Sequence, residues 1–113
     1  YFTLSQVTIA KEVRSILLAD LSQNHTARGL ANRFQIGETS LKNYFRGVFG
    51  ENLSVWLREA RMRRAAELLR DTELRVAEIA EQVGYENQSK FAAVFAKQFG
   101  CPPLEYRRRA RLD

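Results

Sequence analysis

Residues 53–70 read LSVWLREARMRRAAELLR, and this stretch decides the fold. It contains no Gly or Pro and is rich in Leu, Ala, Arg and Glu, a composition typical of a helix. Asn52, directly before it, is a suitable N-cap because its side-chain oxygen can accept from a free N–H of the first turn. We therefore predict one long helix over residues 53–70.

This helix carries two sets of apolar residues, each spaced i, i+3, i+4, i+7. The second set begins nine residues after the first, which is about two and a half turns, so the two sets lie on roughly opposite sides. A helix that buries one side early and the other side late is expected to link two small helical lobes. The two sets are Leu53, Trp56, Leu57 and Ala60, and Met62, Ala65, Ala66 and Leu69.

The flanking segments show helical spacing and no strand pattern, so we predict an all-α fold of about seven helices. Thr3 with Gln6 resembles a capping box, and Gly50 and Gly100 are expected to stop helices. A single domain of residues 1–113 would contain one lobe at about 5–52, the linker helix at about 53–70 and a second lobe at about 75–111. The expected helices cover about residues 5–21, the segment after Thr26, residues 38–49, 53–70, the segment from Val76 to Val83, residues 87–99 and a short helix opened by Pro102 and Pro103.

An internal repeat relates the two lobes. Each copy reads as a helix, a short turn and a second helix, the layout in which the second helix enters the DNA major groove. The offset between the copies is 49 before the turn and 50 after it, so the second copy has one extra residue, at the turn or at the start of the following helix. The matched residues are Leu30, Ala31 and Phe34 with Ile79, Ala80 and Val83, and Leu41, Phe45, Phe49, Gly50 and Trp56 with Phe91, Phe95, Phe99, Gly100 and Tyr106.

Composition favours a polyanionic partner. The net charge is +5 and the pI is about 9.8, and an apolar content of 45% argues against disorder. A merely soluble basic protein would show the same charge. One cysteine allows no internal disulfide and suits a reducing compartment, and no apolar run approaches the length of a membrane span. The first residues lack a signal-peptide layout and an initiator Met, so we expect a piece of a larger protein.

Residues 26–109 resemble the DNA-binding domain of the AraC/XylS transcription regulators. The most specific part is EIAEQVGYENQSKFAAVFAKQFGCPPLEYR, from Glu78 to Arg107. The resemblance implies seven helices, two helix-turn-helix lobes and a long linker helix. It also implies that the third and sixth helices enter adjacent major-groove segments of double-stranded DNA. An N-terminal effector or dimerisation domain, RNA polymerase as a further partner, a cytoplasmic and nucleoid-associated location and no membrane contact are implied as well.

Candidate base-reading residues lie on the outward sides of the third and sixth helices. Cationic side chains can hydrogen-bond guanine, Asn can pair with adenine, and Ala can touch thymine methyl groups. The family often has Arg where this chain has Asn43 and Ala93, so we expect Gln88 and Ser89 to carry most hydrogen-bonded reading in the second lobe. The candidates are Thr39, Lys42 and Asn43 in the first lobe, and Gln88, Ser89, Lys90, Ala92 and Ala93 in the second.

Phosphate contacts are expected to set the register and the salt dependence. For each candidate, the alternative is that it is simply a solvated surface charge. For Arg46 we favour a phosphate contact over a base contact. The candidates are Arg46, Arg61, Arg64, Lys97 and the run Arg107, Arg108 and Arg109. Eighteen helical residues span roughly 27 Å, less than the roughly 34 Å between successive groove entries on one face of B-DNA. We therefore predict that full engagement bends the DNA, or that only one lobe docks deeply.

Enzymatic and metal chemistry find little support in the sequence. His25 and Cys101 are the only His and Cys, whereas a zinc site wants about four closely spaced ligands. The acidic residues read as solvated faces, and the glycines do not form a phosphate-cradling loop. We expect no catalytic residues, no metal and no cofactor. A helical protein-interaction module with an incidental basic surface is the alternative to a DNA-binding domain.

Overall fold

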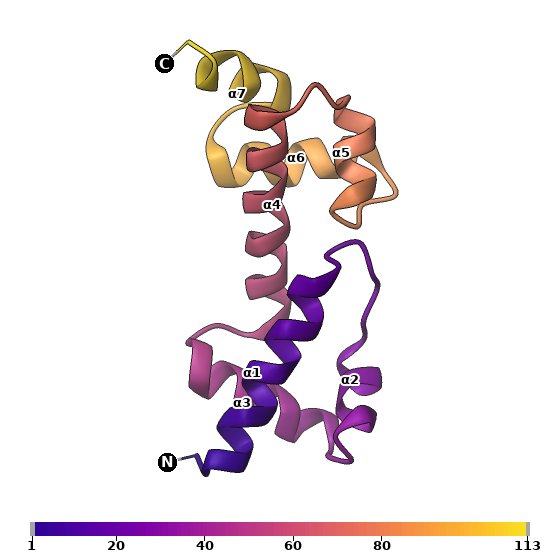
Figure 1. Cartoon of the computed structure of the whole chain (residues 1–113), viewed down its shortest axis with the longest axis vertical. Helices are drawn as coiled ribbons and strands as arrows, with labels where there is room; N and C mark the ends of the chain where they lie inside the picture. The colour runs from indigo at the N-terminus through magenta and orange to yellow at the C-terminus, as the bar shows by residue number, and fades with distance from the viewer. Residues whose placement is uncertain (1, 113) are drawn as a thin grey trace. The chain divides into compact units, whose positions relative to one another are not determined.

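The computed structural model describes residues 2–112, and these contain seven α-helices and no strand (Figure 1). This confirms the predicted all-α fold and the predicted helix count. The helices are α1 (Leu4–Ala19), α2 (Ala27–Arg33), α3 (Glu38–Phe49), α4 (Leu53–Asp71), α5 (Val76–Gln82), α6 (Gln88–Phe99) and α7 (Pro103–Ala110).

Local chemistry explains where most helices begin. Thr3 and Gln6 form the predicted capping box at α1. The side chains of Thr26, Asn52 and Asn87 accept from the backbone N–H groups of the first turns of α2, α4 and α6 at 2.9, 3.1 and 2.9 Å, respectively.

The first helix ends two residues earlier than predicted, at Ala19 instead of about Leu21. The carboxylate of Asp20 accepts hydrogen bonds from the backbone N–H and the hydroxyl of Ser22 at 2.9 and 2.5 Å. These bonds lower the pKa of Asp20. A local side-chain turn of this kind competes with helix continuation, which apolar spacing alone does not reveal.

The chain divides between Leu57 and Arg58 into two compact units, each with its own core. The core of the first unit contains Val13, Leu17, Leu30, Ala31, Leu41 and Phe45, with Leu53, Trp56 and Leu57 of α4 packed against it. The core of the second unit contains Met62, Ala65, Ala66, Leu68, Leu69, Ile79, Ala80, Val83, Phe91 and Phe95. Three residues of the first apolar set of α4 and all four of the second therefore pack in different cores, as predicted, and the remaining residue, Ala60, is buried.

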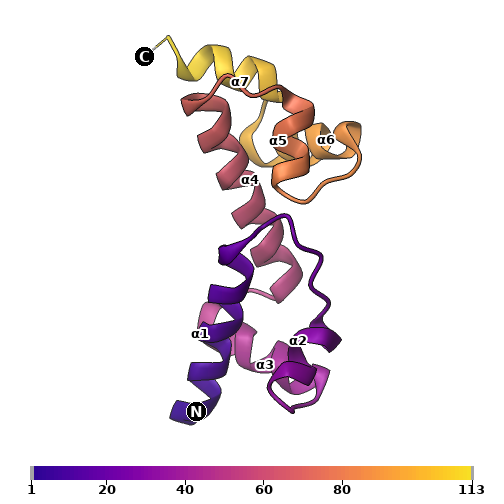
Figure 2. The same cartoon turned by 45° about the vertical axis from the view of Figure 1, so that its right-hand side comes forward.

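The sequence repeat is a structural repeat. In the first unit Phe45 packs on Phe49 and Trp56, with ring centroids 4.7 and 5.4 Å away, and in the second unit Phe95 packs on Phe99 and Tyr106 at 4.6 and 5.4 Å. The start of α4 thus closes the first unit as α7 closes the second. Figure 2 shows the short helix that precedes each of α3 and α6, namely α2 and α5.

Both helix-turn-helix turns use the same backbone hydrogen bonds. Ile36 N donates to Ala31 O at 3.1 Å, and Tyr85 N donates to Ala80 O at 2.8 Å. The N-caps of the following helices are Gly37 and Asn87, so the first turn has two residues between caps and the second has three. The extra residue of the second copy is therefore Glu86, in the turn and not in the helix.

Candidate nucleic-acid interface

Helix α3 packs its apolar face against the core of the first unit, so that its polar face points to solvent. Leu41 and Phe45 are fully buried in the core of the first unit. All predicted reading residues of this unit are exposed, and Lys42 Nζ pairs with Glu38 Oε1 at 3.1 Å. An exposed i, i+4 pair contributes little and leaves the ammonium group available to a stronger anion. The exposed residues are Thr39, Lys42, Asn43 and Arg46.

The sixth helix repeats this arrangement with different chemistry. Phe91 and Phe95 are fully buried, in register with Leu41 and Phe45. The predicted reading residues Gln88, Ser89, Lys90 and Ala93 are exposed, whereas Ala92 is only half-exposed. A small residue there lets the helix approach a partner surface, although it offers less contact than the sequence suggested.

The repeat register exposes a difference between the two reading faces. The offset of 50 aligns Lys42, Asn43 and Arg46 of α3 with the alanines at 92, 93 and 96 of α6. The predicted reading residues of the first unit are thus polar and cationic, while those of the second are polar only in the first turn of α6. Ala96 was not predicted to lie at the site, although the repeat offset applied to Arg46 would have found it.

Five predicted phosphate-binding side chains are exposed, namely Arg46, Arg64, Lys97, Arg108 and Arg109. Arg64 pairs with Glu67 at 3.0 Å, and Arg108 lies 3.9 Å from Glu105. Both pairs are solvent-exposed, so either guanidinium can turn to a phosphate at small cost.

Arg61 has a more constrained setting. Its guanidinium carbon lies 6.0 Å from the centroid of the Tyr85 ring, and the side chain is half-buried. Burial lowers the pKa of Arg61 and raises the pKa of Tyr85. A guanidinium over a ring is attracted by the face of the π-system, so Arg61 is partly engaged within the second unit.

Arg107, also predicted to bind phosphate, makes internal hydrogen bonds that would compete with such a contact. Its Nε donates to Leu69 O at 2.9 Å, and its Nη2 donates to Thr72 O at 3.1 Å and to Leu74 O at 2.6 Å. Helix C-termini leave backbone carbonyls without partners, and Arg107 satisfies those at the end of α4. Its guanidinium is therefore a structural clamp between α7 and the α4–α5 connection.

The same connection is held by a residue that the sequence analysis did not select. Arg111 Nη2 donates to Thr72 O at 2.6 Å, and Arg111 Nη1 pairs with Glu73 Oε1 at 2.8 Å. Arg107 and Arg111 are one turn apart on α7, an i, i+4 pair, so both can point at one target. In the sequence, these arginines form one basic cluster. Only the folded structure shows which of them hydrogen-bond within the protein and which are exposed.

Side chains of other chemistry form no site in the described part of the chain. No group of three or more His, Cys, Asp or Glu residues is arranged to hold a metal ion there. Cys101 is a free cysteine and is buried. No helix between residues 2 and 112 is both long and apolar enough to cross a membrane.

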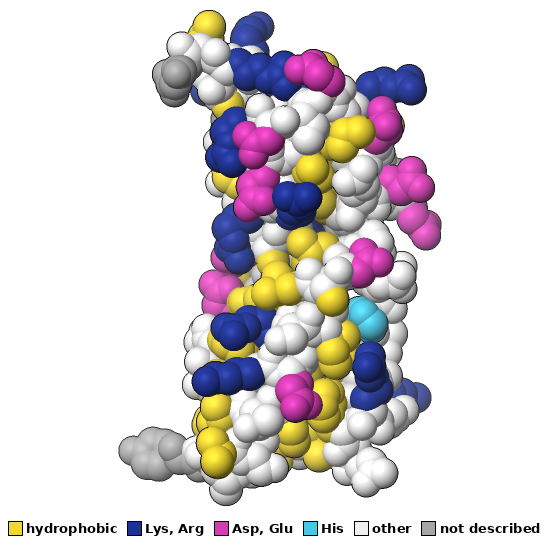
Figure 3. Space-filling model, in the orientation of Figure 1, with side chains coloured by type: hydrophobic (Ala, Val, Ile, Leu, Met, Phe, Trp, Pro, Cys, Tyr) yellow, Lys and Arg dark blue, Asp and Glu magenta, His cyan; other side chains and the backbone are white. Residues whose placement is uncertain are grey.

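The surface in Figure 3 mixes Lys and Arg with Asp and Glu and shows no continuous field of one sign. Two short helices that present exposed faces after tight turns define the class of the protein: an all-α, double helix-turn-helix nucleic-acid-binding domain.

Comparison with known proteins gives the family. A family model described as a helix-turn-helix domain matches residues 30–109. The HTH-type transcriptional activator RhaR of Mannheimia succiniciproducens is 32% identical over 105 residues, which cover 93% of this chain and 38% of that protein. RhaR of Yersinia pseudotuberculosis is 35% identical over 97 residues, covering 86% and 33%. The chain thus spans about a third of the length of these relatives.

Solved structures agree with this family. The C-terminal domain of AraT, a response regulator from Geobacillus stearothermophilus, is 34% identical with a TM-score of 0.85, covering 89% of this chain and 84% of that one. The DNA-binding domain of AdpA, a global transcriptional factor solved with a target DNA, is 26% identical with a TM-score of 0.85, covering 91% and 93%. The chain belongs to the AraC-type helix-turn-helix family, the DNA-binding domains of transcription regulators.

Proposed function

We propose that the chain reads double-stranded DNA by placing α3 and α6 in adjacent major-groove segments, with the two units acting as one DNA-binding domain. The observation that carries this is the repeat: each helix buries two large residues at the same register and exposes the same opposite face. A scaffold repeated at this register presents equivalent surfaces to equivalent partners, and successive major-groove segments are such partners.

The two faces are proposed to read different bases. Asn43 is suited to adenine, and Lys42 to guanine, while Thr39 suits either. In the second unit Gln88 and Ser89 supply hydrogen bonds, Lys90 supplies a cationic donor, and Ala92 and Ala93 contact thymine methyl groups. Arg46, Arg61, Arg64, Lys97, Arg108 and Arg109 hold phosphates.

The wider setting is also a proposal. The parent protein is proposed to carry an N-terminal effector or dimerisation domain, as expected of relatives more than twice as long. RNA polymerase is the proposed second partner and the cytoplasm the proposed location, where the nucleoid lies. Catalysis has no place in this function, and no cofactor is needed for it.

The reading role of α6 is tested by Gln88→Ala. The variant should lose on the order of 1–3 kcal/mol of binding free energy on a preferred duplex. Binding to a scrambled duplex should not change, because lost base contacts do not affect phosphate contacts. Fluorescence anisotropy with both duplexes measures the difference, and equal weakening on the two would contradict the assignment.

Lys97→Ala is the matched variant on the same helix. A lost phosphate contact should weaken binding to both duplexes alike and reduce the slope of log K against log salt by about 0.9.

The same titrations distinguish the proposed DNA-binding function from a protein-interaction module. A DNA reader has a steep salt slope and prefers its selected duplex, whereas an incidental basic surface shows no preference.

A further inference from the structure

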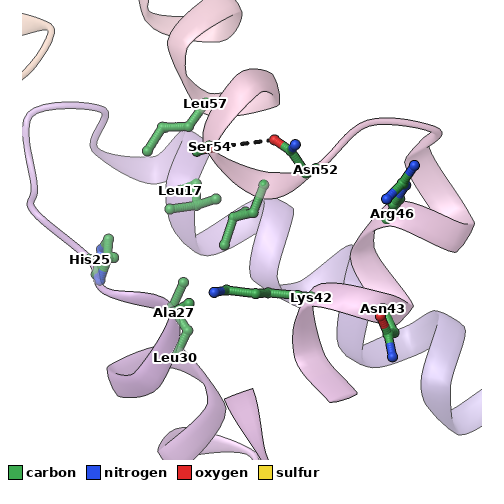
Figure 4. A pocket seen from close by; sticks show the side chains of 11 residues that line it. Leu17, His25, Ala27, Leu30, Lys42, Asn43, Arg46, Asn52, Ser54 and Leu57 are labelled. Atoms are coloured by element: carbon green, nitrogen blue, oxygen red, sulfur yellow. Dashed lines mark hydrogen bonds between the residues drawn. The ribbon is translucent and has the colours of Figure 1, made fainter. Parts of the chain in front are cut away.

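The first unit contains a cavity of about 540 Å³ beside α3 (Figure 4). Its floor is apolar and comes from α1, α2 and the start of α4, through Leu17, Leu30, Leu53 and Leu57. Concave sites of roughly 300–1,000 Å³ with an apolar lining and a few converging polar groups are typical of small-molecule binding. The cavity is therefore large enough for a compact organic ligand.

The rim of this cavity is cationic. Lys42 extends from α3 into the opening, and Asn43 and Arg46 stand on the same side (Figure 4). His25 lies across from them. No Asp or Glu lines the cavity, in contrast to the hollows that include Glu59 or Glu12. Glu38 pairs with Lys42 from outside the lining, at 3.1 Å and exposed to solvent, where such pairs are weak.

Hydrogen-bonding groups of the α4 start complete the lining. Asn52 Oδ1 accepts from the Ser54 hydroxyl at 3.1 Å and from Val55 N at 3.1 Å (Figure 4). Asn52 and Ser54 thus place polar atoms in the lining of the cavity. A ligand at this site would thus meet leucine side chains inside, and donors and positive charge at the mouth.

These features indicate one class of occupant. A bare phosphate or a DNA backbone satisfies the cations but gains nothing from four leucines, and a neutral apolar molecule leaves the cations unused. We propose that the cavity binds a small monoanionic compound with an aromatic or aliphatic body. Its anionic group pairs with Lys42, Arg46 adds positive charge to the lining, and its body rests on Leu30 and Leu57.

The site has a regulatory consequence, which rests on the proposed function. Lys42, Asn43 and Arg46 line the cavity and are also the polar reading face of α3. A bound anion occupies these cations and withdraws them from DNA. Ligand and DNA therefore exclude each other at the first unit, by the reciprocity that governs any two linked equilibria.

The test uses the fluorescent probe 8-anilinonaphthalene-1-sulfonate, a monoanion with an apolar body, and the intact chain. One probe should bind per chain with a change in emission from Trp56, the only tryptophan, which packs in the adjoining core. N-phenyl-1-naphthylamine lacks the sulfonate and should bind at least about 10-fold more weakly. Inorganic phosphate in large excess should not displace the probe.

Variants locate the site. Lys42→Gln with Arg46→Gln should weaken probe binding about 10-fold or more, whereas Arg64→Gln with Lys97→Gln removes two exposed charges elsewhere and should change it less than twofold. Ala27→Leu places extra methyl groups in the cavity. It should abolish probe binding while the cooperative thermal transition is retained, and its DNA binding should resist the probe.

The outcomes separate the two proposals. The ligand site is overturned if probe binding is unchanged in the Lys42/Arg46 and Ala27 variants. It is also overturned if more than one probe binds per chain, or if phosphate displaces the probe. DNA affinity is measured first without probe, so its absence contradicts the proposed function while the ligand site stands. Simultaneous binding of probe and preferred duplex at full affinity overturns the regulatory consequence alone.

Discussion

At the scale of single residues, the two turns differ in how well their residues suit the backbone. The residue after each helix cap adopts a left-handed conformation, with φ of 55° at Gln35 and 89° at Gly84. In this conformation Cβ crowds the following carbonyl, which costs roughly 1–2 kcal/mol for a residue other than glycine. The first turn therefore carries strain that the second avoids.

Gln35→Gly should stabilise the protein. Relief of the left-handed strain outweighs the greater chain entropy of glycine, and we expect a net gain of about 0.5–1 kcal/mol in the free energy of unfolding. Urea denaturation measures it. Gly84→Ala is the reverse change at the matched position and should cost about 1 kcal/mol or more. A loss of stability on Gln35→Gly would show that the Gln35 side chain makes compensating contacts.

At the scale of helices, α7 acts on α4 through arginine. Arg107 donates three hydrogen bonds to carbonyls around the end of α4, and Arg108 beside it pairs only loosely with Glu105. Hydrogen bonds from a charged donor contribute about 1.5–3 kcal/mol each, and shared bonds of one group do not add fully. The two neighbours should therefore behave differently on truncation.

Arg107→Ala should lower the free energy of unfolding by about 2–4 kcal/mol, because the carbonyls at Leu69 and Leu74 lose a charged partner. Arg108→Ala, the matched control, should stay within about 0.5 kcal/mol of the parent chain. Thermal and urea unfolding of the two variants provide the comparison. Equal stability of both variants would contradict the clamp assigned to Arg107.

Helix α3 carries a contact that sequence periodicity does not reveal. A Cβ on Gly47 would clash with the ring of Phe2, so the missing side chain makes room for that ring. Phe2 also packs edge-on against Tyr44, with centroids 6.0 Å apart, and Gln6 Nε2 donates to the Tyr44 hydroxyl at 3.4 Å. Glycine inside a helix lowers the stability of the helix. The packing of the Phe2 ring explains why glycine is nevertheless found at position 47.

At the scale of the whole molecule, the features that could be predicted from the sequence are those that follow from residue patterns with a fixed period. The two apolar faces of α4, the capping box at Thr3 and the cap at Asn52 follow from spacing and residue type, and the structure confirms them. The end of α1 and the role of Arg107 depend on side-chain hydrogen bonds that form only in the folded chain. Spacing cannot supply these.

The reading residues are a different case. Their exposure follows from the helix period, and the structure has them on the outward faces of α3 and α6, apart from the half-exposed Ala92. Which of them meets a base and which meets a phosphate depends on the docked DNA. That assignment and the expected bending of DNA therefore stay predictions, and binding measurements have to test them.

The most direct test of the central claim, that both units read bases, is a binding-site selection from random duplexes with the parent chain, Asn43→Ala and Gln88→Ala. We predict two preferred segments separated by about one helical turn, roughly 10 base pairs. Asn43→Ala should relax one segment and Gln88→Ala the other. A single preferred segment, or one segment relaxed by both variants, would contradict the account.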